Sequence, residues 1–495
     1  MDFDHLFPHL TAASPWLFGV VALVAAFLLF IQKRNNLPPG PKRLPLLGNA
    51  HQLPTKTPWT TFGQWAKTYG NLIHVDLFGQ PIIIINSRKI ASELLDKRSA
   101  VYSDRPVIPI AEITELGNSL AFLHYNNAWR KQRKMLAQEL TVSGVDQFQT
   151  LMEREWRVQV KNILKNPGSI FSETKWRAGV ISMRALYGYC VHNPKDPMLA
   201  VPLEGIREFS RLSTPGMSLA LRYLPRWTPG VTFFKDAANY HRLHVASVKT
   251  PYDWCRKNTK SGTALMPNLC CNIMEKSSTL DEAEHNQIYN ALASALGGAL
   301  ESNASSALTF YINMILHPNV QRKGQAEIDA VVGSSRLPNI SDQPNLPYVR
   351  AILAETLRIM PPIPLCIPHA LNEDDIYEGY FLPKGAWVLP NIWHMLRDPD
   401  IYPDPAIFNP DRYNGDDDAM EQVKSPVFGF GRRGCPGRLF GENSLFALLA
   451  TTLATCEILP GIDEDGNEVP PSGEYTTGTI RYVDRGDGFL SSQMG

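Results

Sequence analysis

Several features that assign proteins to common classes are scarce or absent in this sequence. Its 495 residues carry 48 basic and 48 acidic side chains, so it lacks the positive excess typical of nucleic-acid-binding proteins. It has only seven cysteines, an odd number without framework spacing, which argues against a disulfide-stapled secreted protein and for a reducing compartment. Hydrophobic residues make up 44% of the chain, enough for a large buried core, and length alone predicts about three domains.

A glycine-dense loop, Phe428 to Gly437, contains Cys435 as its only soft metal ligand. A helical pattern, 438–456, follows at once, and Pro436 stands where the first helical residue is expected. The cysteine sulfur would therefore lie at a helix N-terminus, where the helix dipole and free N–H groups stabilise negative charge. We predict that Cys435 is a thiolate and the axial ligand of haem iron.

The neighbours of Cys435 have expected roles of their own. We expect Gly431 and Gly434 to let the backbone fold tightly and direct N–H groups toward the sulfur, and Gly437 to let the helix approach a flat macrocycle. Arg433 is placed to meet a haem propionate.

Two other interpretations of the loop lack support from its surroundings. The spacing Gly429-x-Gly431-x-x-Gly434 matches a dinucleotide fingerprint, but no strand precedes it and no ribose-binding acid follows in a βαβ unit. A zinc site needs partners at Cys-x-x-Cys or His-x-x-x-His spacing, and none lies near Cys435. The third alternative is a structural buried cysteine, which is common in general.

The loop resembles the haem-binding signature of the cytochrome P450 family, Phe-x-x-Gly-x-Arg-x-Cys-x-Gly, and every fixed position matches. This agreement argues against a merely structural cysteine. The resemblance implies a mainly α haem-thiolate fold with a small β region, one catalytic domain over residues 51–495, and haem b as its cofactor. It also implies that Phe428, Arg433 and Gly437 contact the cofactor.

An uncharged apolar segment, residues 16–32, precedes this domain. As a helix rising about 1.5 Å per residue it would be roughly 26 Å long, just enough to cross a bilayer. A cleaved signal peptide is the alternative, but acids precede the segment and bases follow it, at Asp2, Asp4, Lys33 and Arg34. The positive-inside rule then makes residues 1–15 lumenal and the domain cytosolic, after a basic, proline-rich hinge at 33–50. We expect a single-pass transmembrane anchor in the endoplasmic reticulum membrane.

Trp129 and Arg133 lie four residues apart in a helical pattern and hence on one face. The indole N–H and the guanidinium could both reach a carboxylate, and the P450 family uses such a Trp-x-x-x-Arg pair on a haem propionate. Alternatively, the basic cluster around Arg133 is a solvated face whose exposed members meet an acidic reductase. Both roles can hold on different sides of one helix.

The long apolar pattern from Ile288 to Leu316 contains one acid, Glu301. A buried acid is costly unless it is paired or used, and Gly297-Gly298 would weaken the helix and open a groove. In the P450 family an acid and an alcohol at such a point relay protons toward the haem, which implies Glu301 and Ser302 as catalytic residues. Ser302 replaces the common threonine and lacks its rotamer-restricting methyl, and Asn303 stands where a second hydroxyl is frequent. We therefore expect leakier or differently gated oxygen activation; a structurally paired acid is the alternative.

Two further motifs follow in family order. Glu355 and Arg358 are spaced to pair on a helix, and Arg412 would complete a buried Glu-Arg-Arg cluster that fixes the cysteine loop. The proline-rich run from Pro361 to His369 cannot be helical, so we expect it to extend along the haem edge, with His369 as a propionate donor.

The segments expected around the substrate are apolar. By resemblance, residues 104–121 form the roof of the substrate pocket and residues 201–234 cover its mouth. The alternative for 104–121 is a surface loop whose apolar side chains are buried. The candidate contacts are Ile108, Ile110, Ile113, Leu116, Ile363, Leu365, Ile367 and the segment Thr477 to Ile480. Elsewhere, Leu72–Phe78 and Ile82–Ile85 predict a hairpin, with an isoleucine strand buried on both faces.

The implied reaction is insertion of one oxygen atom from O2 into a lipophilic small molecule. Electrons would come from NADPH–cytochrome P450 reductase, with cytochrome b5 as a candidate second donor, because this length leaves no room for a flavin domain. Pro368-His369 followed by Asp374-Asp375 resembles fungal secondary-metabolism monooxygenases, including the O-methylsterigmatocystin oxidoreductase-like and tryptamine hydroxylase-like groups. A redox-independent haem-thiolate isomerase or dehydratase is the alternative and would usually lack the acid-alcohol pair, while a haem sensor or carrier would need neither pocket nor relay.

Overall fold

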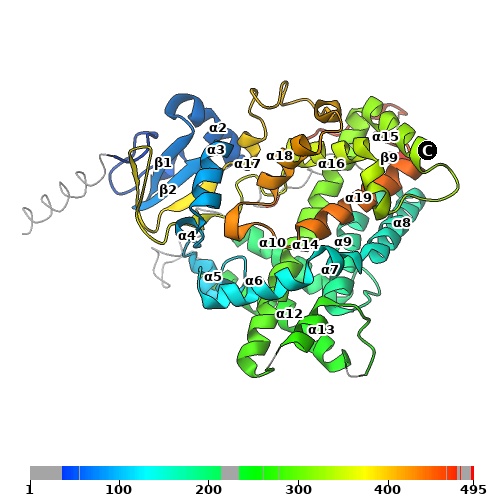
Figure 1. The fold of residues 1–495 in the computed structure, drawn as a ribbon, viewed down its shortest axis with the longest axis horizontal. Coiled ribbons are helices and arrows are strands. Elements are labelled where there is room, and N and C mark those ends of the chain that lie inside the picture. The colour runs from blue at the N-terminus through cyan, green and yellow to red at the C-terminus, as the bar shows by residue number, and fades with distance from the viewer. Residues whose placement is uncertain are drawn as a thin grey trace, which may run out of the picture.

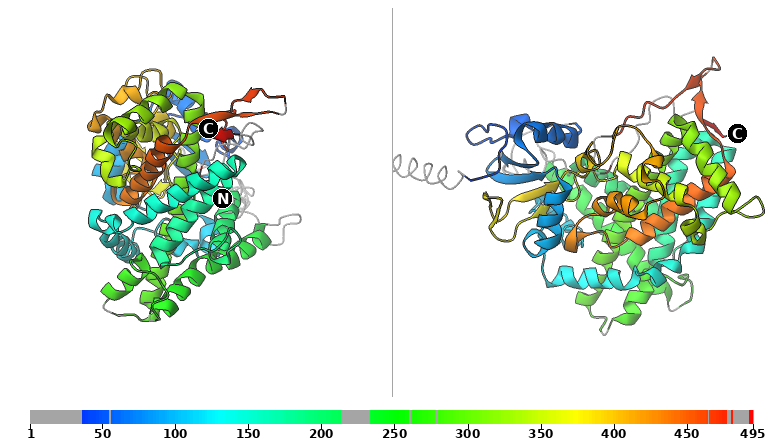
Figure 2. Two further views of the ribbon diagram at one scale, coloured as in Figure 1. Left: turned by 90° about the vertical axis from the view of Figure 1, so that its right-hand side faces the viewer. Right: turned by 45° about the horizontal axis from the view of Figure 1, so that its top comes forward.

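The computed structural model describes residues 36–476 except 55, 213–232, 260, 278 and 464, together with residues 480 and 492–494. These residues are mainly helical, with most helices gathered on one side of the molecule and the β1–β2 sheet at the opposite end (Figure 1). The right-hand view in Figure 2 shows the same division. The predicted fold, mainly α with a small β region, is confirmed.

The described α-helices, in chain order, are α2 (Pro58–Tyr69), α3 (Arg88–Ala91), α4 (Ser99–Tyr102), α5 (Pro109–Ile113), α6 (Asn127–Glu139), α7 (Val142–Asp146), α8 (Gln149–Lys165), α9 (Ile170–Tyr187), α10 (Pro197–Leu212), α12 (Phe233–Thr259), α13 (Leu269–Lys276), α14 (Glu282–Leu316), α15 (Pro318–Val331), α16 (Pro347–Ile359), α17 (Ile392–Met395), α18 (Asp417–Val427) and α19 (Arg438–Thr455). The short turns used below are η2 (Ser92–Lys97), η5 (Ile340–Asn345), η6 (Pro410–Tyr413) and η7 (Gly431–Arg433). The strands are β1 (Leu72–Leu77), β2 (Gln80–Ile85), β3 (His369–Ala370), β4 (Asp375–Tyr377), β5 (Tyr380–Leu382), β6 (Trp387–Pro390), β7 (Ile458–Ile462), β8 (Glu468–Val469) and β9 (Ser492–Met494).

The longest helix, α14, packs against α6, α9, α16 and α19 and so connects the helical layers. It begins at Glu282, earlier than the predicted Ile288, because the side chain of Asp281 caps it by accepting a hydrogen bond from a first-turn N–H. It stays helical through Gly297-Gly298, where we expected weakened backbone hydrogen bonds. A Cβ on either glycine would meet open space, so the expected gap beside the helix exists without a break in it.

The predicted hairpin is confirmed by β1 and β2, which pair antiparallel from Leu72 opposite Ile85 to Leu77 opposite Gln80. Phe78 and Gly79 form its turn with positive φ angles of 52° and 86°, one residue earlier than the predicted turn. β2 also pairs in parallel with β6, which gives the order β1-β2-β6-β3. Ile82–Ile85 are all buried, as the isoleucine run predicted. Two smaller sheets have the orders β4-β5 and β8-β7-β9.

The predicted Glu-Arg-Arg cluster is present between α16 and η6. Arg358 Nε lies 2.7 Å from Glu355 Oε2, and Arg412 Nε lies 3.2 Å from Glu355 Oε1. The Tyr413 hydroxyl also donates to Glu355 Oε2 at 2.7 Å, a contact that the motif did not predict. Arg358 donates further to the carbonyls of Leu396, Pro405 and Ile407. One fully buried ion pair therefore ties down the segment before the cysteine loop.

Some predictions fall outside the described residues. The predicted lumenal segment 1–15, the predicted anchor 16–32 and the start of the hinge lie there, as do 213–232 of the expected pocket mouth and 477–479. Among the described residues, no helix combines the length and the hydropathy needed to span a membrane.

Candidate active site

Cys435 lies in the loop between η7 and α19. Its backbone N–H donates to the Phe428 carbonyl over 2.7 Å, which closes the loop at its base. Because α19 begins at Arg438, the sulfur lies at a helix N-terminus, as predicted. The side chain is accessible to solvent, yet burial by surrounding protein raises the pKa of the Cys435 thiol. Cys435 can therefore be reached by a ligand, although protein atoms lie close around it.

The glycines of this loop act differently from our prediction. Gly431 has a φ of 52°, and its N–H donates to Asp96 Oδ1 over 2.6 Å. A Cβ there would lie 2.1 Å from the Leu95 carbonyl oxygen, so this glycine lets the loop dock closely on η2. Gly434 donates to the Gly431 carbonyl. The N–H that reaches the sulfur is that of Gly437, so the prediction for Gly431 and Gly434 was wrong.

The position of Cys435 at a helix N-terminus does not by itself lower the pKa of its thiol. Burial raises the pKa of Cys435 more than the Gly437 N–H and the charges of Arg133 and Arg438 lower it. The protein alone therefore does not make a thiolate, whereas a coordinated metal ion deprotonates a thiol outright. Within the described ranges, no group of three or more His, Cys, Asp or Glu side chains is placed to hold a metal ion. An ion at Cys435 must bring its other ligands with it, as a porphyrin does.

Three buried or partly buried arginines lie near one another beside this loop. Burial, followed by the charges of Arg105 and Arg133, lowers the pKa of Arg433 to about 8. Burial lowers the pKa of Arg105 to about 10. Because arginine stays protonated in proteins, these shifts identify a region with too little negative charge. The nearby acid, Asp104, already accepts hydrogen bonds from the Tyr125 N–H and from His124.

Backbone carbonyls hold these guanidinium groups in place. Arg133 donates to Gly434 of the cysteine loop over 2.6 Å. The carbonyls that accept from Arg433 are those of Ser103, Leu120 and Leu123, and those that accept from Arg105 are Ala121, Ile367 and Pro368. The arginines therefore join the cysteine loop to segments 103–123 and 367–368, and their charges are fixed before any anion binds.

His369 lies on β3, fully enclosed by protein. Its Nδ1 lies 2.9 Å from the Tyr102 carbonyl oxygen, and because a carbonyl only accepts, Nδ1 carries the proton. Its Nε2 is buried and has no hydrogen-bond partner among the described residues. Burial, followed by the charge of Arg105, lowers the pKa of His369 to about 3. A propionate at Nε2 would favour protonation, so donation to a propionate stays a prediction.

Trp129 and Phe428 flank the loop from two sides. Trp129 lies on α6 with Arg133, as predicted, and its ring carries the Arg433 guanidinium 4.7 Å from the ring centroid. Phe428 has the Arg438 guanidinium 5.6 Å from its own ring centroid. A Cβ on Gly437 would meet open space, which leaves room for a flat group beside the loop.

The predicted acid and alcohol point to different neighbours. Glu301 is 7% exposed, and its Oε1 lies 3.7 Å from Lys175 Nζ on α9. The Ser302 hydroxyl donates to the Gly298 carbonyl over 2.6 Å. Ser294, Gly298 and Ser302, four residues apart, form a solvent-accessible stripe along a largely buried helix.

One backbone unit connects this stripe to the arginines. The N–H of Ala121 donates to Ser294 Oγ over 3.3 Å, and its carbonyl accepts from Arg105 Nε over 2.8 Å. The accessible face of α14 and the arginine-bearing segment therefore border the same region. Glu301 lies on another side of the helix, against α9.

Several predicted substrate contacts are packing residues instead. Ile110 is fully buried against Ala237 and Tyr240 of α12, so its prediction was wrong. Leu365 packs against the cluster formed by the β1–β2 hairpin, and Leu116 is buried. Ile363 and Ile367 are partly exposed and stay predictions.

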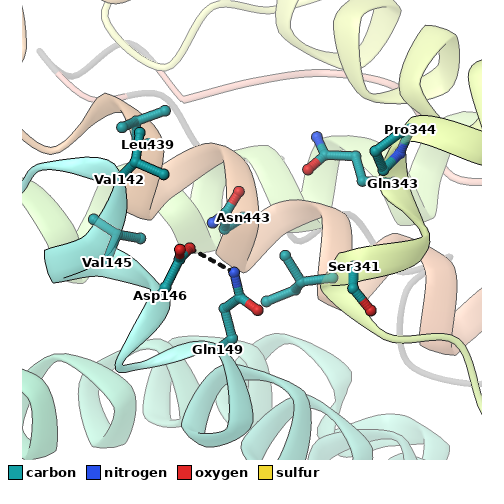
Figure 3. A pocket seen from close by; sticks show the side chains of 10 residues that line it. Val142, Val145, Asp146, Gln149, Ser341, Gln343, Pro344, Leu439 and Asn443 are labelled. Carbon is teal, nitrogen blue, oxygen red and sulfur yellow. Dashed lines mark hydrogen bonds between the residues drawn. The ribbon is translucent and has the colours of Figure 1, made fainter.

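A separate groove of about 240 Å³ lies between α7, the start of α8, η5 and the first turns of α19 (Figure 3). Val142 and Leu439 form its apolar rim, and Gln149 donates to Asp146 inside it over 2.7 Å. None of the predicted haem-site residues lines this groove. It is therefore not the cofactor site.

Sequence reasoning missed three residues of the site. Arg105 and Asp104 lie in a segment that we considered only for its apolar side chains, and Lys175 belongs to no motif. Their charges were the only available signal. Charge alone does not show which segments meet in space.

The residues present fit a haem group. Cys435 supplies one soft ligand, and the arginine cluster lacks the negative charge that two propionates would bring. Open space adjoins Gly437 and Gly298. The unpartnered Nε2 of His369 is a further polar group that a ligand can satisfy.

Comparison with known proteins agrees with this fit. A family model described as Cytochrome P450 matches residues 38–474. The chain is 45% identical over 470 residues to cytochrome P450 monooxygenase 105 of Postia placenta, covering 94% of this chain and 90% of that protein. It is 35% identical over 487 residues to cytochrome P450 monooxygenase claR of Ampulloclitocybe clavipes, covering 96% and 90% respectively. The chain therefore belongs to the cytochrome P450 family of haem-thiolate monooxygenases, in which a cysteine thiolate binds the haem iron.

Proposed function

We propose that this chain inserts one oxygen atom from O2 into a lipophilic small molecule, as a hydroxylation step in fungal secondary metabolism. The observation that carries the proposal is the accessible Cys435 in a loop beside arginines that lack counter-charge. Relatives named as monooxygenases over nearly the whole chain support the reaction. The sequence motif Pro368-His369 followed by Asp374-Asp375 resembles those of fungal secondary-metabolism monooxygenases, and this supports a role in secondary metabolism.

In this proposal Cys435 binds the iron, and Arg133, Arg433 and His369 hold the propionates with Trp129 packed behind Arg433. Phe428 and Gly437 shape the cysteine side of the cofactor. Haem bound here supplies the oxygen chemistry, because a thiolate ligand favours O–O cleavage. The chain itself must exclude water, position the substrate and deliver protons.

Proton delivery is assigned to Glu301 and Ser302. Ser302 lies on the accessible stripe of α14, where its hydroxyl can pass a proton toward the proposed cofactor site after leaving the Gly298 carbonyl. Glu301 faces α9, where it pairs with Lys175. In the proposed relay the Glu301 carboxylate takes up a proton on the α9 side, and rotation of the protonated side chain carries that proton to the Ser302 hydroxyl.

Electron delivery is assigned to NADPH–cytochrome P450 reductase, with cytochrome b5 as a second donor. Arg130 and Arg432 are exposed and lie on the ring of Tyr125, 4.9 and 5.3 Å from its centroid. Two like charges on one ring repel each other, and a carboxylate of a partner protein relieves that repulsion. Arg432 lies three residues from Cys435, so the donor would dock close to the iron ligand.

A membrane location is also proposed, from the apolar segment 16–32 and the charges that flank it. The uncharged run and its basic C-terminal flank support a single-pass anchor in the endoplasmic reticulum membrane, with the catalytic domain in the cytosol. A lipophilic substrate dissolved in the membrane would be available to an enzyme held there.

The test is oxygen-isotope incorporation by the full-length enzyme. Anchored protein, a fungal reductase, NADPH and labelled O2 are incubated with lipophilic extracts, and Cys435→Ala serves as the control. One labelled atom in a product that requires the reductase is the expected result. An unlabelled product that forms without NADPH would overturn the proposal in favour of an isomerase or dehydratase.

A further inference from the structure

A stack of aromatic rings and guanidinium groups runs from the cofactor site to the surface. The Arg433 guanidinium lies 4.7 Å from the ring centroid of Trp129, and the ring centroids of Trp129 and Tyr125 are 5.0 Å apart. Tyr125 in turn carries Arg130 and Arg432, which are both exposed. Trp129 is 5% exposed, whereas Tyr125 is half-buried. The two rings therefore bridge the cofactor site and the solvent.

The two rings of this stack can be oxidised, and its guanidinium groups cannot. Indole and phenol side chains each give up one electron to a strong oxidant, and bound haem supports such one-electron chemistry. Rings whose centroids are 5.0 Å apart are in packing contact, so an electron can pass between them without any bond being made. The Trp129–Tyr125 pair is therefore a path along which an electron can travel from the surface to the cofactor site.

The arginines determine which ring keeps the oxidised state. An indole that has lost an electron is positively charged, and Arg433 repels that charge. A phenol that loses an electron also loses its O–H proton and stays neutral. Burial raises the pKa of Tyr125, but hydrogen bonds from Arg130 and Arg432 outweigh it and bring the pKa below its ordinary value. These charges favour proton release, so the oxidised state moves outward from Trp129 to Tyr125.

We propose that Trp129 and Tyr125 form an exit route for oxidising equivalents, which protects the enzyme when oxygen is activated without a substrate. Trp129 gives one electron to the oxidised haem and regains one from Tyr125, whose phenol proton passes to bulk water. A reductant in solution, such as ascorbate or a thiol, then returns one electron and one proton to the Tyr125 radical. Two such passages supply the two electrons that reduce one molecule of hydrogen peroxide, which takes up two protons and ends as two molecules of water.

A second tyrosine–tryptophan pair provides the matched control. The ring centroids of Tyr189 and Trp254 are 4.7 Å apart. Tyr189 is also half-buried, and its hydroxyl donates to Asp196 over 3.0 Å. This pair joins α12 to the segment after α9 and contains no residue predicted to contact haem. Ring contact alone therefore occurs in both pairs, and only the Trp129–Tyr125 pair is linked to the cofactor site.

The test uses the full-length haem protein without substrate or reductase. Hydrogen peroxide is mixed with the wild type and with Tyr125→Phe, Tyr125→Trp and Tyr189→Phe, and rapidly frozen samples are measured by electron paramagnetic resonance. A nitroso spin trap followed by peptide mass spectrometry identifies the residue that carries the radical. The half-life of the haem absorbance in peroxide is measured with and without ascorbate, and the carbon monoxide difference spectrum monitors the haem site.

We expect a tyrosyl signal in the wild type and in Tyr189→Phe that is several-fold weaker in Tyr125→Phe, with the trap adduct on Tyr125. Ascorbate should lengthen the half-life of the haem absorbance several-fold in the wild type and in Tyr125→Trp, but not in Tyr125→Phe. Phenylalanine keeps the ring that packs on Trp129, so a purely structural role for Tyr125 would leave the effect of ascorbate unchanged in Tyr125→Phe.

An equally strong tyrosyl signal in Tyr125→Phe would overturn the proposal. If Tyr125→Phe binds no haem, the wild-type trap adduct decides: an adduct on Tyr125 upholds the exit route, and adducts confined to other residues overturn it.

The inference rests on haem bound at Cys435 and goes beyond the proposed oxidation of a substrate, so the two can fail separately. Labelled product from the oxygen-isotope assay without a Tyr125 radical would overturn the exit route and leave the proposed function intact. A Tyr125 radical in an enzyme that forms no labelled product would uphold the exit route and count against the proposed function.

Discussion

Burial sets the charge state of the key side chains at this site. Cys435 lies at a helix N-terminus, yet the pKa of its thiol is raised, because the surrounding protein removes more water than one N–H and the nearby arginines compensate. The pKa of His369 falls to about 3 for the same reason, with the charge of Arg105 as the next cause. Both residues are therefore prepared for a ligand that brings its own charge.

Ser302→Thr should reduce peroxide leakage. The Ser302 hydroxyl donates to the Gly298 carbonyl in the present structure, and without a β-methyl it can rotate among three staggered positions. A threonine restricts that choice, so we expect the peroxide released per NADPH to fall by up to about threefold. Peroxide and product are measured in the same reductase assay. Ser302→Ala is the control and should increase leakage; equal leakage in wild type and Ser302→Thr would contradict the prediction.

Lys175→Met should move the acid limb of the pH–activity profile to higher pH. The Lys175 ammonium group lies 3.7 Å from Glu301 Oε1, and the loss of a neighbouring positive charge disfavours the charged form of a carboxylate. The solvent isotope effect on turnover should rise as well, because proton delivery becomes slower. Lys175→Arg should keep the wild-type profile, and Lys161→Met, on the exposed face of α8, is a second control. An unchanged profile in Lys175→Met would show that the pair is only structural.

At the scale of elements, α14 has one solvent-accessible face, to which the proton relay is assigned by proposal, and other faces that pack against its neighbours. Its stripe of Ser294, Gly298 and Ser302 is accessible, while Glu301 is directed at α9. Gly297 and Gly298 leave open space beside the helix because they have no side chain, and the helix stays continuous through both residues. The loop carrying Cys435 is held separately, through Asp96 and the buried Glu355 cluster behind it.

Glu355→Gln should destabilise the protein by about 3–5 kcal/mol, because it leaves the fully buried Arg358 without its counter-charge. Denaturant unfolding of the haem protein, followed by haem absorbance and by circular dichroism, measures this loss. Lys323→Gln is the matched control: its partner Asp411 and Lys323 itself are both largely exposed, and such pairs contribute below about 1 kcal/mol. Equal stability losses in the two variants would contradict the assignment.

At the scale of the whole molecule, one exposed charged surface is assigned to a partner protein. The Arg130–Tyr125–Arg432 stack lies beside the cysteine loop and is the proposed reductase contact.

Arg432→Glu should weaken reductase docking without changing the haem site. We expect KM for the reductase to rise about tenfold, equivalent to roughly 1.4 kcal/mol, with kcat at saturating reductase unchanged. The dependence of KM on salt should also become weaker. The charge-matched control is Arg322→Glu, because Arg322 is also exposed but lies on α15, an element separate from the cysteine loop. A fall in kcat with unchanged KM would contradict the prediction, because it would indicate that Arg432 stabilises the cysteine loop and does not contact the reductase.

Much of the site could be predicted from the sequence because its motifs are local. The cysteine loop, the Trp129–Arg133 face, the Glu355–Arg358 pair and the β1–β2 hairpin each depend on residues that are close together in the chain. The errors came from longer range: Gly431 serves contact with η2, and Ile110 packs on α12. No pattern within either segment records those partners.

The sequence by itself identified the family, through its motifs, and Cys435 as the expected iron ligand. It also predicted the helices that carry the candidate site, because helical spacing dictates which side chains share a face. Only the tertiary structure decided which charges meet. It placed Arg105 with Arg133 and Arg433 and set Lys175 against Glu301. These outcomes depend on desolvation and on contacts between segments far apart in the chain, and a linear pattern carries no information about either.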